Sequence, residues 1–220
     1  SLWLNDKPFK KDLEKVLNRD IKLMNDANCF TLSEAIDGAG KDFKSVFGVI
    51  IGTGFGGGLS YKKEIIEGAN QIAGDWGHQP LPYPTTEEIE TQISCPSNNC
   101  GRALCAEQFM SGIGFADIFN KKNNTNFNSH EIVELDLKND PRANLEFNLY
   151  EDRMARLMAV MIGVFDPDAI ILGGGMSNID RLYKNIPSLL PKYTFSNKVK
   201  TKILKNIHGD SSGVRGAAWL

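Results

Sequence analysis

The sequence lacks both a long hydrophobic run and a large charge of either sign. No apolar stretch approaches the ~18 residues that a membrane-spanning helix needs, and Lys and Asp stand near the start, where a signal peptide would be apolar. With 25 Lys and Arg against 27 Asp and Glu, the net charge is −2, which gives no electrostatic basis for binding nucleic acid or anionic lipid. We therefore expect a cytoplasmic protein that binds neither nucleic acid nor membranes.

Cysteine is scarce, with four in the chain, yet Cys95, Cys100 and Cys105 lie close together in the sequence. In a reducing compartment such a cluster more often binds metal than forms disulfides. Together with His78 it provides one imidazole and three thiolates, a tetrahedral set for structural Zn²⁺. Zinc would order a segment rich in Gly and Pro that has little apolar core. Cys29 lies in an apolar stretch and is expected to be a buried thiol.

Strands and helices alternate along the predicted chain. Apolar runs rich in β-branched residues at 45–51 and 169–172 predict buried strands, each followed by glycines, and residues 21–24 predict a weaker one. Further helices are expected at 10–18, 29–36, 103–110, 130–137, 141–164, 179–190 and from 213 onward. This order is typical of an α/β fold, in which ligands bind beyond the carboxyl ends of the strands.

Two glycine turns are candidate nucleotide sites. Ile51–Gly58 reads IGTGFGGG; its bare backbone can approach phosphate oxygens, and Thr53 adds a hydroxyl donor. It has no Gly-Lys-Ser/Thr of a Walker A loop, and a plain hairpin turn explains it equally well. Ile171–Ser177 reads ILGGGMS and offers a flat backbone to an adenosine, although close packing of a strand on the next helix is a slightly better explanation.

Asn25 and Asp26 are expected at a strand-to-helix turn. An Asp placed there can accept a proton from a substrate hydroxyl, and phosphoryl transfer needs little beyond such a base, cradled phosphates and Mg²⁺. Taken alone, however, Asp26 is better explained as a helix cap.

Six strings in sequence order resemble the ROK family of sugar kinases and repressors. They are NDANCFTLSEA, IGTGFGGG, AGDWGHQPLP, CGRALCAE, ILGGGMSNIDRLY and HGDSSGVRGAAWL. The third and the last look most like the bacterial fructokinase (mannofructokinase) branch. No single string is specific, but the ordered series is.

The resemblance implies the actin-like, hexokinase-like (ribonuclease H-like) fold of two α/β lobes with a sugar cleft between them. Residues 1–40 would end the first lobe, and 41–220 would form the second, with a zinc loop at about 75–107. The family's opening Asp-x-Gly-Gly-Thr hairpin is not found, and the chain begins at Ser1 without a Met. We therefore expect a missing N-terminal part, and a chain that is inactive on its own.

The resemblance also assigns roles. Asp26 would be the catalytic base. The sugar would be bound by Asn25, Asp26, Asp75, His78 and Glu107. The nucleotide would be bound by Gly52, Thr53, Gly54, Gly173, Gly174 and Gly175. Zinc would be bound by His78, Cys95, Cys100 and Cys105.

This sequence departs from the family pattern in two places. Asp75 replaces a Glu and is one methylene shorter. In the cysteine segment Leu104 replaces a Gly, and the residues 96–99 displace Cys95, which leaves open whether Cys95 is the fourth ligand.

The implied activity is ATP- and Mg²⁺-dependent phosphorylation of a hexose at its primary hydroxyl, with fructose as the expected substrate and a homo-oligomer, a dimer, as the expected assembly. N-acetylglucosamine kinase of the same family is the nearest alternative. A ROK transcriptional repressor and an inactive sugar-binding fragment are the others.

Overall fold

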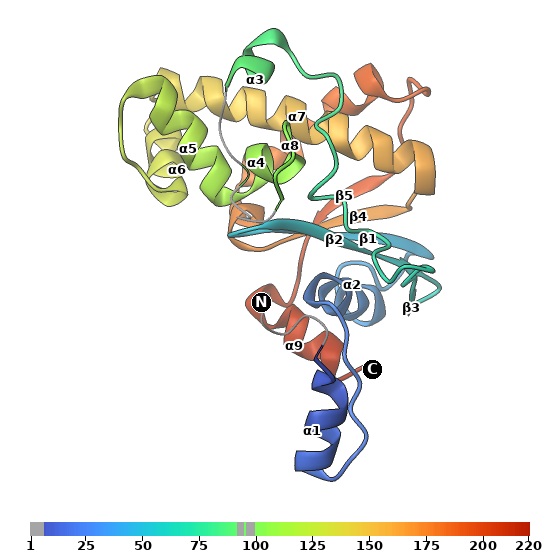
Figure 1. Ribbon diagram of the computed structural model, residues 1–220. Helices are drawn as coiled ribbons and strands as arrows, with labels where there is room; N and C mark the ends of the chain where they lie inside the picture. Colours follow the sequence, from blue (N-terminus) through green and yellow to red (C-terminus); the bar gives the residue numbers. More distant parts are fainter. Residues whose placement is uncertain (1–6, 92–94, 96–99) are drawn as a thin grey trace.

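The computed structural model describes residues 7–91, 95 and 100–220. A five-stranded sheet lies between two layers of helices (Figure 1). The strand order is β3-β2-β1-β4-β5. The strands are β1 (Ser45–Ile51), β2 (Phe55–Tyr61), β3 (Glu64–Ile65), β4 (Ala169–Gly173) and β5 (Lys202–Lys205).

The pairing of the strands explains where ligands can bind. β1 pairs with β2 antiparallel and with β4 parallel, and β4 pairs with β5 parallel. In the β1–β4 register Ile50 lies opposite Gly173, so the carboxyl ends of both strands meet at one edge. The two glycine turns predicted from the sequence therefore emerge side by side at the edge where α/β folds bind ligands.

Most helices cover one face of the sheet, the upper face in Figure 1. They are α3 (Thr86–Glu90), α4 (Ala106–Met110), α5 (Gly112–Asn123), α6 (Ser129–Leu137), α7 (Pro141–Phe165) and α8 (Asp180–Tyr193). The long α7 begins with an Asp140 side chain that accepts from the Arg142 and Ala143 N–H groups, and Pro141 occupies the first turn, where no donor is needed. The main core, with Phe47, Phe115 and Tyr150 fully buried, lies between this layer and the sheet.

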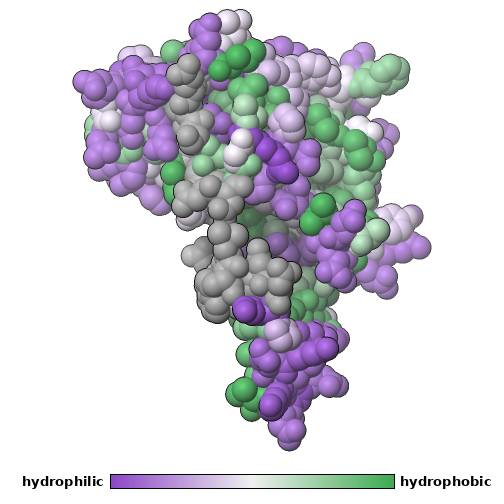
Figure 2. Space-filling view, in the orientation of Figure 1, coloured by the Kyte–Doolittle hydropathy of each residue, from purple (hydrophilic) through white to green (hydrophobic). Residues whose placement is uncertain are grey.

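The opposite face carries α2 (Asp26–Ile36) and α9 (Ser212–Ala217). Here Phe30, Val46 and Ile171 form a smaller core. α1 (Phe9–Leu17) projects away below α9 in Figure 1 and buries none of its residues. Figure 2 shows apolar side chains among the hydrophilic ones on this projecting part of the surface.

A buried carboxylate joins α2 to the C-terminal segment. Glu34 is inaccessible to solvent, and its two oxygens accept from the Ile207 and His208 backbone N–H groups at 3.2 and 3.3 Å and from the Ser212 hydroxyl at 2.8 Å. A further hydrogen bond comes from the Ala39 N–H. Because Ile207, His208 and Ser212 all follow β5, these bonds tie the C-terminal segment to the helix that carries Asp26.

Replacing Glu34 by Gln is expected to lower the free energy of unfolding by about 2 kcal/mol, because in either orientation the new NH₂ group would face at least one backbone N–H donor. Urea unfolding measures the change. The matched control is Glu90→Gln, on the exposed surface of α3, which should change stability by less than about 0.5 kcal/mol. Equal effects of the two substitutions would show that the Glu34 bonds contribute no special stability.

Most predicted elements are present, and three differences have physical causes. Residues 21–24 form no strand, because none of the described strands runs beside them to complete a ladder. α5 was not predicted, since Gly112 and Gly114 weaken its helical pattern. β5 was also missed, because its lysines at both ends and its partly exposed Ile203 do not read as a buried strand.

The mixed sheet and its helices confirm the α/β class. Among the described helices, none combines the length and the apolar character that crossing a bilayer requires. α2 packs on the same sheet as the following elements, and the predicted lobe boundary at residue 40 stays a prediction.

Candidate active site

Asn25 and Asp26 share the start of α2 but play different parts there. The Asn25 side chain caps the helix, accepting from the Ala27 and Asn28 N–H groups at 2.8 and 3.4 Å. Asp26 is the first helical residue, and its Oδ1 accepts from the Ala27 N–H at 2.8 Å. Because Asn25 supplies the cap, the helix does not depend on the Asp26 carboxylate, which is exposed.

A cavity of about 130 Å³ lies beside this turn. It brings together Asn25, Asp26 and Asp75, three of the residues predicted to bind sugar, and the backbone of β2 at Gly56 and Gly57. His78 and Glu107 do not line it. The cavity therefore brings together three of the five residues predicted to bind sugar, the predicted base among them.

Glu107, one of the two remaining residues of the predicted sugar set, contacts the end of the glycine turn. It is buried, and its Oε2 accepts from the Phe55 N–H at 3.1 Å. Its Oε1 lies 3.6 Å from the Cys95 sulfur. Glu107 thus lies between the end of the β1–β2 turn and the cysteine segment.

A second cavity, of about 740 Å³, opens at the carboxyl edge of the sheet. Gly52 and Thr53 of the first glycine turn line it, and so does Gly175 of the second. Gly54, Gly173 and Gly174 do not line it. The structure therefore brings the two turns together around one large cavity, as their places in the sequence suggest.

Gly174 shows why the second turn needs glycine. Its φ of +79° is a backbone conformation that residues with a side chain rarely adopt. A Cβ at this position would lie 2.5 Å from the carbonyl oxygen of Ile51. The two turns can lie this close only because no side chain separates them. Gly174 thus packs against β1 rather than against the following helix, while its neighbour Gly175 borders the cavity.

The far wall of the large cavity consists of α5, α6 and their connection, and the sequence did not predict it. Asp117, Asn120, Asn126 and His130 are among its lining residues. The run of asparagines from Asn123 to Asn128 was the available signal, because it predicts a turn rich in side-chain hydrogen bonds.

The β1–β2 hairpin connects the two cavities. Gly52 and Thr53, at its turn, line the large one, while Gly56 and Gly57, a few residues further along β2, line the small one. A ligand in the large cavity that reaches the turn therefore comes within a short stretch of backbone of Asp26.

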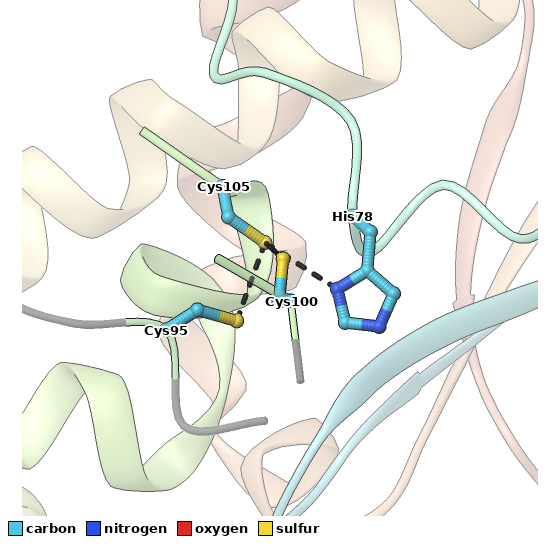
Figure 3. Close-up of side chains that lie close together, drawn as sticks. All are labelled: His78, Cys95, Cys100 and Cys105. Carbon is cyan, nitrogen blue, oxygen red and sulfur yellow. Dashed lines mark hydrogen bonds between the residues drawn. The ribbon is translucent and has the colours of Figure 1, made fainter. Parts of the chain in front are cut away.

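His78, Cys95, Cys100 and Cys105 converge as the sequence predicted (Figure 3). Their ligand atoms all lie within 4.8 Å of one another, and the Cys105 sulfur is 3.4 and 3.5 Å from those of Cys95 and Cys100. Thiolates about 2.3 Å from a tetrahedral zinc ion lie about 3.8 Å apart, so this set fits the ion. Cys95 faces the other ligands; the residues 96–99, which displace it in sequence, lie outside the described residues.

Ion pairs between α3 and α7 hold the part of the chain that follows His78. Glu88 of α3 is buried and receives hydrogen bonds from Arg153 and Arg156 of α7, at 2.8 and 2.6 Å. Burial raises the pKa of the Glu88 carboxyl, but the hydrogen bonds from Arg156, the Thr85 backbone and Arg153 outweigh it and lower the pKa overall. The Arg156 guanidinium also donates to the Pro82 carbonyl at 2.8 Å, so α7 holds the chain shortly after His78.

This sheet order, with two cavities along the β1–β2 hairpin, places the chain in the class of actin-like, hexokinase-like α/β proteins. The model of the ROK family matches residues 1–220, and the chain therefore belongs to the ROK family.

Relatives and solved structures agree with this assignment. The N-acetyl-D-glucosamine kinase of Vibrio atlanticus (strain LGP32) is 39% identical over 214 residues, which are 97% of this chain and 71% of the relative. The ROK hexokinase of Thermus thermophilus superposes with a TM-score of 0.84 at 23% identity, over 97% of this chain and 68% of its own. A ROK glucokinase of Streptomyces griseus, solved with glucose and AMPPNP, gives 0.80 at 24% identity, over 96% and 71%. The solved structures confirm the predicted fold class.

Proposed function

We propose that this protein is an ATP-dependent kinase that phosphorylates N-acetylglucosamine at its primary hydroxyl. The observation that carries the proposal is the β1–β2 hairpin, whose turn lines the large cavity and whose second strand lines the cavity of Asp26. A nucleotide in the large cavity with its phosphates at Gly52 and Thr53 would present them toward the sugar cavity.

Asp26 would act as the general base. Its carboxylate would take the proton of the sugar hydroxyl as that oxygen attacks the γ-phosphorus of ATP, and ADP would leave with the electrons of the broken bond. The hydrogen bond from the Ala27 N–H to Oδ1 fixes the orientation of the carboxylate. Asn25 and Asp75, which share its cavity, would bind sugar hydroxyls, with His78 and Glu107 as the remaining predicted contacts.

The glycine turns would bind the nucleotide. The backbone N–H groups of Thr53 and Gly54 and the Thr53 hydroxyl suit phosphate oxygens, while the Gly52 N–H closes the turn onto the Gly54 carbonyl at 3.0 Å. The backbone of Gly173 to Gly175 suits the adenosine. Mg²⁺, when bound with ATP, supplies charge neutralisation at the phosphates.

Zinc would have a structural part. His78, Cys95, Cys100 and Cys105 would hold the ion and so order the segment from Asp75 to Glu107. The nearness of the Cys95 sulfur to Glu107 supports a link between this site and the predicted sugar contacts, since Glu107 also holds the Phe55 N–H of the hairpin.

The choice of sugar follows the relatives rather than the short strings. The short strings favoured fructose, but the similar kinases act by name on N-acetyl-D-glucosamine. This supports the alternative substrate, N-acetylglucosamine.

ADP release by the complete protein with ATP and Mg²⁺ tests the choice across N-acetylglucosamine, glucose, mannose and fructose. We expect kcat/KM for N-acetylglucosamine to exceed that for fructose by at least about tenfold, since a site built for a polar substituent rejects sugars that leave it unpaired. A preference for fructose would instead assign the protein to the fructokinase branch. Failure with every sugar would favour a repressor or a sugar-binding protein.

A further inference from the structure

The large cavity has a wall without regular structure. Residues 124–128 connect α5 to α6, and this segment, the 124–128 loop, lines the cavity through residues 126–128. Loops of this kind are mobile unless their backbone polar groups find fixed partners. The 124–128 loop therefore needs fixed partners if it is to form a stable wall of the cavity.

One side chain, Asn120 of α5, holds it. Its Oδ1 accepts from the Phe127 N–H at 2.8 Å and from the Thr125 hydroxyl at 2.9 Å. Its Nδ2 donates to the Phe127 carbonyl at 2.7 Å. Both polar groups of the Phe127 backbone are thus bound by a single amide, as a neighbouring strand would bind them.

The backbone of Asn120 adds to this arrangement. Its carbonyl accepts from the Thr125 N–H at 3.2 Å and from the Asn124 N–H, where α5 ends in the left-handed conformation. Asn120 therefore holds the residues on both sides of Asn126, which is exposed and lines the cavity. Because Oδ1 already accepts two hydrogen bonds, it has little capacity left for a ligand.

We propose that Asn120 is a positioning residue for the nucleotide: it fixes the 124–128 loop, and so Asn126 and Phe127, as the wall against which the nucleotide binds. The inference rests on the proposed function in placing a nucleotide in this cavity. Asn120 would act on the nucleotide through the 124–128 loop. Its replacement should therefore weaken nucleotide binding and leave sugar binding unchanged.

The variants separate positioning from direct contact. Asn120→Ala removes the side-chain bonds to the loop without adding charge and keeps a good helix former in α5. Thr125→Val removes one of those bonds at a residue that does not line the cavity. The matched control is Asn123→Ala, on the same helix, whose amide donates only to the Phe119 carbonyl at 2.8 Å and does not line the cavity.

Binding of ADP to the complete protein, measured by titration calorimetry, is the test. We expect Asn120→Ala to weaken binding about tenfold and Thr125→Val about threefold, while Asn123→Ala stays within about twofold of wild type. The KM for the sugar should not change in any variant. Equal effects of Asn120→Ala and Asn123→Ala would overturn the inference, and so would weakening by Asn120→Ala with none by Thr125→Val, which would indicate direct contact.

The outcomes also separate this inference from the proposed function. ADP binding that follows the expected order, without sugar phosphorylation, would leave the inference standing and remove the kinase assignment. A wild-type protein that does not bind ADP would overturn both.

Discussion

Replacing Asp26 by Asn is expected to lower kcat by about a hundred- to ten-thousand-fold, the usual contribution of a positioned general base. An Asn side chain keeps an oxygen that can accept from the Ala27 N–H, so the geometry of the turn survives while the capacity to take a proton is lost. Because Asn25 caps the helix, α2 should remain folded, and sugar affinity should change little. Steady-state kinetics with ATP and the sugar measure the loss.

The control for this prediction is Asp12→Asn, which also changes an acidic residue in the first turn of a helix, here α1, none of whose residues is buried. It should leave kcat and the melting temperature near those of wild type. Turnover by Asp26→Asn within about threefold of wild type, far short of the usual contribution of a base, would remove Asp26 from the base role and favour its interpretation as a helix-start residue.

Replacing Cys105 by Ser is expected to abolish zinc binding and to lower the melting temperature on the order of 5 to 10 °C. Cys105 is buried at the centre of the set, 3.5 Å from the His78 Nδ1 and close to both other thiols. It also lies at the start of α4, two residues before Glu107. Loss of the ion should therefore displace Glu107 and lower activity as well.

Elemental analysis and thermal unfolding test this prediction. Wild type should contain about one zinc ion per chain, and a chelator should reproduce the effects of Cys105→Ser. The matched control, Cys29→Ser, changes a buried thiol of α2 outside the set and should retain zinc. A wild-type protein free of zinc, with a melting temperature unaffected by chelator, would contradict the metal site.

Local patterns in the sequence were sufficient for the sheet edge and the metal cluster. The apolar runs of β1 and β4 are unmistakable, and each ends in glycines, so their parallel pairing brings the two turns together. His78 and Cys105 lie together because the chain around them pairs: the Glu107 N–H donates to the Gly77 carbonyl and the Ala106 N–H to the Gln79 carbonyl, both at 2.8 Å.

The sequence was less informative where function depends on long-range contacts. Nothing local distinguishes Asn120 from other surface amides, because its role depends on the loop folding back onto α5. Glu34 reads as an ordinary helix residue, yet its partners lie near the other end of the chain. The sequence also did not indicate which sugar is bound, since the side chains of Asp26 and Asn25 suit the hydroxyls of any hexose.

The central claim is that the hairpin joins a nucleotide cavity to a sugar cavity with Asp26 as the base. The most direct test is phosphorus NMR of the complete protein incubated with ATP, Mg²⁺ and N-acetylglucosamine. The account predicts that ADP and N-acetylglucosamine phosphorylated at its primary hydroxyl appear in equal amounts. ATP that remains intact, or ADP that appears with free phosphate and no sugar phosphate, would contradict it.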